Sequence, residues 1–284
     1  MFKFLKIKYL LIILSFSFLG LPLVNYAIRP YFKLNKNDPN SDDIIRVYLN
    51  HDFKKARYIA SITPKEPNSI LVKALIDIYS NESPNIHSGL DELRVIYENE
   101  KYPSRIRTQA GITYARHIQV YRARKMYPVY SEIDFQSVYK NVIAKLAPDS
   151  DLACQSACYL AESYFDNHDF QKQQQLFKFI EQFTNNFQGN PKDLVAVHVI
   201  ADKFYIELWD DYENSTRHLI RAYETGITKD ILAKDSLFRI ARISEVKLKN
   251  NLQAKRYYEL FLNSYPNSDL APLAKRYLNE LEKR

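Results

Sequence analysis

Two helical patterns that face each other between residues 152 and 183 constrain the fold more than any other feature. Their apolar residues lie three or four positions apart, so each set lines one side of a helix. The two sets are Ala157, Leu160, Ala161, Tyr164 and Phe165, then Phe170, Leu176, Phe177, Ile180 and Phe183. The polar run Asn167-His168-Asp169 between them favours a turn. Neither helix buries its apolar stripe alone, so the pattern predicts an antiparallel pair with another pair beside it.

The rest of the chain repeats this arrangement. Asn50-His51-Asp52-Phe53 recurs as Asn167-His168-Asp169-Phe170 at the turn of another predicted pair. We expect about six helix pairs of roughly 30 to 40 residues, which suits a repeat array. The last pair is followed by a single amphipathic helix, Leu270–Leu281, whose polar side would close the array. The sequence therefore predicts an all-α solenoid with a C-terminal capping helix.

The same positions carry a resemblance to the tetratricopeptide repeat (TPR), a helix–turn–helix of about 34 residues. Residues that fall where that repeat has its Leu, small, Tyr, Asp, aromatic and Phe positions are Leu160, Ala161, Tyr164, Asp169, Phe170 and Phe177. The C-terminal run also resembles repeats of bacterial envelope proteins, namely the BamD-like outer-membrane assembly lipoprotein and periplasmic cell-division coordinators. Its matching residues are Phe261, Leu262, Tyr265, Pro266, Ser268 and Ala271.

The resemblance covers roughly residues 43 to 284 and implies a right-handed superhelical array of TPR-like pairs. It also implies binding of partner proteins in a concave groove lined by the first helix of each pair, without enzymatic activity. On this basis we expect partner contacts at Glu162, Phe165, Tyr205 and Trp209. The alternative for Trp209 is packing between adjacent pairs.

The N-terminus carries an export pattern. Lys3, Lys6 and Lys8 precede an apolar run from Tyr9 to Val24, and Ala27 is an acceptable last residue before cleavage. We expect residues 1–27 to be a signal peptide or a signal anchor, residues 28–42 a polar linker, and residues 43–284 the repeat domain. The chain would then lie in the periplasm, either free or tethered to the inner membrane through residues 9–24.

The residues that could carry chemistry form no known constellation. Cys154 and Cys158 lie on one helical side, where a metal half-site or redox pair competes with simple core packing, which we favour. The six histidines show no metal-ligand spacing, and we find neither a hydrolase motif nor a phosphate-binding loop. We therefore expect no catalytic residue, metal or cofactor.

Charge adds little about partners. The formal net charge is +7, without a long Lys/Arg block, so we expect no nucleic-acid partner. The stretch Arg105–Lys125 is unusually basic and is either a solvated helix surface or a contact for anionic lipid, nucleic acid or an acidic peptide.

The patterns together predict a non-catalytic protein-binding scaffold of the bacterial cell envelope. The alternative is an enzyme, or an accessory subunit, that processes cell wall or peptides and uses the helical array as a substrate platform. No small-molecule substrate is evident.

Overall fold

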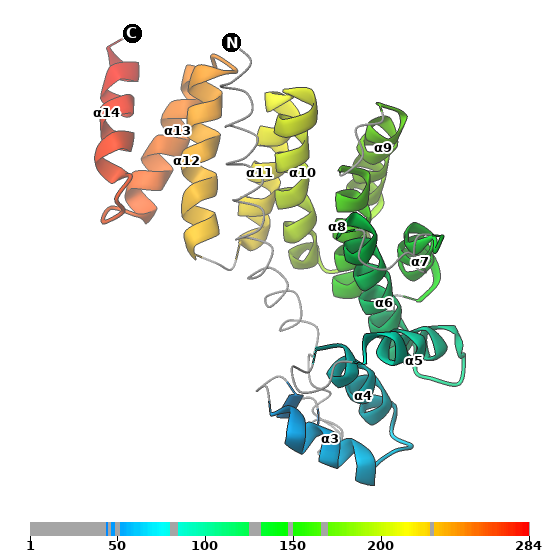
Figure 1. Ribbon diagram of the computed structural model, residues 1–284. Helices are drawn as coiled ribbons and strands as arrows, with labels where there is room; N and C mark the ends of the chain where they lie inside the picture. Colours follow the sequence, from blue (N-terminus) through cyan, green and yellow to red (C-terminus); the bar gives the residue numbers. More distant parts are fainter. Residues whose placement is uncertain are drawn as a thin grey trace. The chain divides into compact units, whose positions relative to one another are not determined.

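The protein is all-α in the residues described by a computed structural model, which are 44, 47–48, 52–79, 85–124, 132–146, 150–165, 170–227 and 230–283. No strand occurs in these ranges (Figure 1). The α-helices are α3 (Phe53–Ile62), α4 (Pro67–Tyr79), α5 (Ile86–Glu98), α6 (Ser104–Arg124), α7 (Phe135–Asn141), α8 (Ser150–Phe165), α9 (Phe170–Asn186), α10 (Val195–Trp209), α11 (Tyr212–Gly226), α12 (Asp230–Val246), α13 (Asn251–Ser264) and α14 (Ala271–Glu282). The prediction of an all-helical chain is confirmed.

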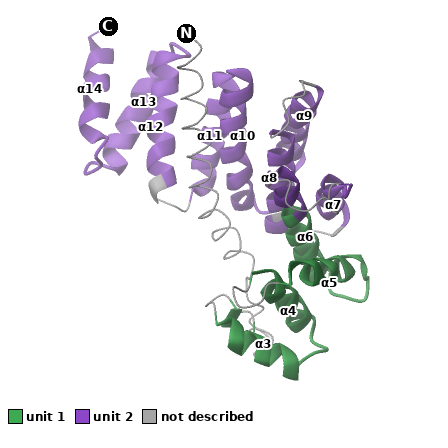
Figure 2. Ribbon diagram, in the orientation of Figure 1, with its two compact units in different colours: residues 1–117 green, residues 118–284 purple. Residues whose placement is uncertain are grey.

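The chain divides into two compact units, residues 1–117 and 118–284 (Figure 2). The predicted export segment (residues 1–27) and linker (residues 28–42) lie outside the described residues. Within the described ranges no helix is both long and apolar enough to span a bilayer.

One local geometry recurs where the second helix of a predicted pair begins. Asp52, Asp134, Asp211 and Asn250 each precede a helix and accept a hydrogen bond from the backbone N–H three residues later, at 3.0–3.1 Å. Their backbone angles are nearly the same, with φ between −79° and −93° and ψ between 70° and 82°. These side chains satisfy a backbone donor that the helix itself leaves unpaired. An aromatic residue follows three of the four caps: Phe53, Phe135 and Tyr212.

In the first unit α4 is the central helix, because both α3 and α5 pack against it. It is apolar on several sides, with Leu71, Val72 and Ala74 each at most 1% exposed. Helix α5 approaches closely at Gly89, where a Cβ atom would lie 2.7 Å from the backbone oxygen of Ala74. A glycine is therefore required at this crossing.

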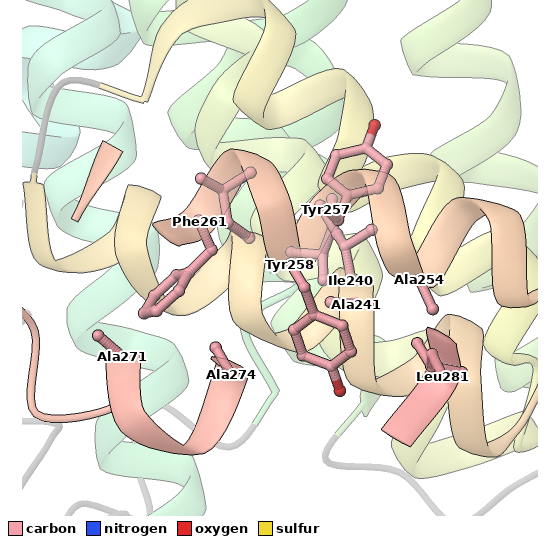
Figure 3. Packing of buried hydrophobic residues seen from close by; sticks show 11 residues of the cluster. Ile240, Ala241, Ala254, Tyr257, Tyr258, Phe261, Ala271, Ala274 and Leu281 are labelled. Atoms are coloured by element: carbon pink, nitrogen blue, oxygen red, sulfur yellow. The ribbon is translucent and has the colours of Figure 1, made fainter. Parts of the chain in front are cut away.

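In the second unit each helix packs mainly on its neighbours in sequence, from α7 on α8 through α13 on α14. Figure 3 shows the C-terminal core, in which Phe261 of α13 points toward Ala271 of α14 and the ring of Tyr258 lies between Ala274 and Leu281. Tyr258, Phe261 and Ala274 are fully buried. Large aromatic residues on one helix thus fill the space above small residues on the next.

Two helices have irregular ends. Helix α7 is α-helical only to Asn141 and continues as a π-helical turn, Val142–Leu146. Helix α10 is preceded by a 3₁₀ turn, Pro191–Leu194, in which the Asn190 side chain accepts from the backbone N–H of Lys192 at 3.1 Å. Proline is well suited to this first turn because its missing N–H would be unpaired there.

The Gly89→Ala variant should test the close approach of α5 to α4. Its methyl group would collide with Ile78 and with the Ala74 carbonyl, so we expect the free energy of unfolding to fall by about 1–3 kcal/mol. Urea unfolding followed by circular dichroism measures this change. Val95→Ala on the same helix is the control, because Val95 is 54% exposed, and should change stability far less. Equal stabilities of the two variants would show that α5 has room to move.

Candidate functional site

Two of the predicted partner residues lie on α8. Glu162 and Phe165 are both half-buried. The Phe165 ring stacks on Phe204 of α10, with centroids 4.8 Å apart, and the Lys203 ammonium lies 5.4 Å from the Phe165 centroid. The end of α8 therefore presents a partly exposed aromatic ring beside a cation from α10.

The other two lie on α10 and belong to a separate aromatic cluster. Tyr205, Trp209 and Phe177 of α9 contact one another edge to face, with centroids 5.1–5.6 Å apart. Tyr205 is fully buried, whereas Trp209 is half-buried and Phe177 is 38% exposed. In this arrangement Tyr205 packs internally, and Phe177 and Trp209 supply the accessible aromatic surface.

Tyr205 also belongs to a partly buried polar network that joins α9, α10 and α11. One carboxylate oxygen of Glu181 accepts from the Tyr205 hydroxyl at 2.5 Å, from Arg217 at 2.8 Å and from His218 Nε2 at 3.2 Å. On its other side, His218 Nδ1 lies 2.8 Å from Nδ1 of His198, and both rings are buried. We call these five residues the Glu181 network.

The hydrogen-bonding capacity of each group determines which nitrogen atoms of this network carry protons. A carboxylate only accepts, so His218 donates through Nε2 to Glu181. A neutral His218 then has Nδ1 as its acceptor, and His198 must donate its own Nδ1–H to it. Protonation of both facing Nδ1 atoms would set two donors against each other at 2.8 Å.

The pKa values agree with neutral rings beside a charged carboxylate. Burial lowers the pKa of both His198 and His218 to about 4. For Glu181 burial acts to raise the pKa, but the hydrogen bonds from Tyr205 and His218 and the Arg217 charge outweigh it and hold the pKa below its usual value. The Tyr205 pKa is raised by burial and by its bond to Glu181.

A second carboxylate, which is buried, extends the connection to α12. Asp202 of α10 is 1% exposed, accepts from the Ser215 hydroxyl of α11 at 2.8 Å and lies 2.9 Å from the Arg239 guanidinium of α12. Burial raises the Asp202 pKa, although Arg239 and Ser215 oppose the shift. Asp202 and the Glu181 network together tie four consecutive helices.

The cysteines are free thiols in the core. Cys154 and Cys158 are 2% and 6% exposed and pack with Ala157 and Val197. Burial raises the pKa of both thiols, which disfavours the reactive thiolate. The expectation that they are packed core residues is confirmed. Over the described ranges, no three His, Cys, Asp or Glu side chains are grouped to hold a metal ion.

A polar hollow of about 280 Å³ lies between α12 and α14. Its lining residues are Arg242, Glu245, Val246, Lys249, Tyr277 and Glu280. The Arg242 guanidinium lies 3.9 Å from the Tyr277 ring centroid and donates to Glu245 at 2.6 Å, and Glu245 also accepts from the buried Tyr258 hydroxyl. The two acidic side chains, Glu245 and Glu280, balance the two cationic ones, Arg242 and Lys249. The hollow therefore favours neither a positively nor a negatively charged ligand.

Comparison of the chain with models of protein families and with curated proteins finds no match. The assignment of a function therefore depends on the residues and contacts described above.

The Glu181 network was not predicted from the sequence. His198 and His218 lie 20 positions apart and share no metal-ligand spacing. A signal was present, however, because each falls on the buried stripe of its helix: His198 with Ala201 and Tyr205, and His218 with Ser215 and Ala222. A histidine on a buried stripe needs a polar partner on the helix that covers it.

The histidine pair makes stability depend on pH. Both pKa values lie below the ordinary 6.5, so the unfolded chain binds more protons in mild acid. The contribution to the free energy of unfolding is complete above about pH 6.5 and is lost as the pH falls toward 4. We expect a loss on the order of 1–3 kcal/mol per histidine, measured by urea unfolding at a series of pH values.

The variant His198→Gln should make that loss shallower, because its amide still donates to His218 but does not titrate. His117, whose pKa burial also lowers to about 4, keeps part of the wild-type dependence. His87→Gln, on the exposed side of α5, is the matched control and should follow the wild type. The same pH dependence in His198→Gln and wild type would contradict this account.

Proposed function

We propose that the protein is a non-catalytic scaffold of the bacterial cell envelope that binds partner proteins along a TPR-like array of about six helix pairs. The main observation in support of the proposal is an N-cap that recurs in the chain. The same backbone geometry precedes four different helices, at Asp52, Asp134, Asp211 and Asn250. Packing of each helix on its sequence neighbours in the second unit supports the same interpretation.

The proposed binding surface lies on the first helices of consecutive pairs, α8 and α10. It has two parts: Glu162 and Phe165 of α8, with Lys203 of α10 over the Phe165 ring, form the first, and Trp209 of α10, in contact with Phe177 of α9, forms the second. Half-buried aromatic rings beside charged groups are suited to partner binding, because the rings supply apolar area and the charges supply orientation. Tyr205 would act indirectly, by supporting Trp209 from beneath.

The first test is photocrosslinking in intact cells, with benzoylphenylalanine at position 162 on the proposed surface. Gln175 of α9 is the matched control position, since it is exposed on the second helix of the same pair. We expect position 162 to capture one or a few envelope proteins, identified by mass spectrometry, and position 175 to capture fewer. Identical products from both positions, or only cytoplasmic products from position 162, would count against the scaffold. Turnover of a cell-wall or peptide substrate by the purified protein would favour the enzyme alternative.

The second test concerns export. We expect the mature protein either to begin near Ile28 and be soluble in the periplasm, or to keep Met1 and remain with the inner membrane. N-terminal sequencing combined with fractionation separates these outcomes. A chain that keeps Met1 and is soluble in the cytoplasm would contradict the envelope location.

A further inference from the structure

Helix α3 exposes two large apolar side chains on one side. Tyr58 is 65% exposed and Ile62 is 60% exposed, and their spacing of four residues places them one turn apart on the same side of the helix. The opposite side carries Ala56 and Ala60, both buried. Helix α3 thus packs on α4 through small residues and directs its large apolar residues away from the core of its unit.

Cations lie on both sides of this apolar pair. At 100° per residue, Lys54 projects about 40° to one side of Tyr58, and Lys55 projects about 20° beyond Ile62 on the other. Arg57 follows on the Lys54 side, where it pairs with Asp77 of α4 at 3.4 Å, and all three cations are exposed. Helix α3 contains no acidic residue. Its outward side is therefore a basic surface with an apolar centre.

We propose that the outward side of α3 docks on an anionic phospholipid surface. Helices that lie in a membrane interface combine cations, which meet the headgroups, with aromatic and aliphatic residues, which enter the acyl boundary. Tyrosine is enriched at this depth of the bilayer. Lysine, by contrast, is depleted at protein–protein interfaces, so two lysines flanking Tyr58 and Ile62 fit lipid better than a protein partner.

The other basic segment, α6, presents its cations differently. In the first unit Arg105, Arg107 and Arg116 are half-buried. The Arg107 guanidinium donates to the backbone carbonyl of Tyr97 at 3.1 Å. These arginines contribute to packing, whereas Lys54 and Lys55 of α3 are exposed beside apolar residues. Helix α3 is therefore the better lipid contact.

The inference rests on the proposed envelope location in one respect. A membrane-inserted Tyr9–Val24 segment would hold α3 near the same leaflet, because the connector from Val24 to Phe53 spans at most about 100 Å when extended. The docking itself uses only residues of α3. The two proposals can therefore fail separately.

The test uses the full-length chain with liposomes. Ser61→Cys places a fluorophore on the outward side of α3, and the buried thiols of Cys154 and Cys158 are protected from labelling. We expect spin-labelled lipid to quench this fluorophore at least about fivefold more in phosphatidylglycerol-containing liposomes than in pure phosphatidylcholine. Ser264→Cys, exposed on α13, is the matched labelling site and should show no such difference.

Charge and apolar variants then identify the contact. Lys55→Glu should lower the ratio of docked to undocked α3 by roughly tenfold, and Tyr58→Ser should lower it as well. Both side chains are exposed, so the fold should survive, as circular dichroism can verify. Lys275→Glu, an exposed reversal on α14, is the control and should leave quenching unchanged.

The remaining outcomes distinguish the two proposals. Equal quenching in both lipids, or full quenching in Lys55→Glu, would overturn the docking. If the chain stays with the liposomes while position 61 remains unquenched, the tether stands and the docking is wrong. If the chain does not join the liposomes at all, the docking and the membrane tether are both wrong, whereas the proposal of a periplasmic scaffold is unaffected. Capture of a protein in cells by benzoylphenylalanine at position 61, without lipid quenching, would reassign this surface to a protein partner.

Discussion

One oxygen of Glu181 accepts three hydrogen bonds. These bonds fix how α9, α10 and α11 of the second unit pack against one another. The Glu181 carboxylate is only 19% exposed, and partial burial of a charge is costly unless the charge is paired, so this contact favours the arrangement in which α9, α10 and α11 bring Tyr205, Arg217 and His218 to one point. Apolar stripes alone would tolerate a shift of one turn between helices. We therefore attribute register, rather than net stability, to this network, with Asp202 doing the same between α10 and α12.

Helix positions were largely predictable from the sequence because apolar periodicity and turn residues are local signals. Apolar periodicity located α6 at Arg105–Lys125, against the observed Ser104–Arg124. Asp211 precedes Tyr212 at the start of α11, where the structure shows that its side chain caps the helix. The π-helical turn at Val142–Leu146 was not predictable, since it reflects a change in backbone bonding that side-chain periodicity does not encode.

The candidate site was less predictable than the fold. Trp209 and Phe165 could be selected as aromatic residues near helix ends, but their exposure depends on neighbours that only the folded chain supplies, such as Phe177 and Phe204. Tyr205 could not be recognised as internal until its hydroxyl was found on Glu181. Which side chains pair between two helices depends on the register of those helices. The spacing of residues within one helix does not determine that register.

Two surfaces with different character emerge from this chain. The α8–α10 surface combines half-buried rings with both signs of charge. On the α3 surface the exposed side chains of Lys54 and Lys55 flank Tyr58 and Ile62. A scaffold built of similar helix pairs can vary such surfaces independently, because each helix needs only its buried side to pack and leaves the other free to change.

The buried thiols of Cys154 and Cys158 have a consequence for the lifetime of the protein in an oxidising compartment. In the folded chain burial raises their pKa and keeps them from oxidants. Opening of α8 exposes both at once, four residues apart on a now flexible segment. Oxidation of the exposed thiols would block refolding, so each opening of α8 carries a risk of irreversible unfolding. The lifetime of an exported molecule would then depend on the rate at which α8 opens, and not on the equilibrium between folded and unfolded forms.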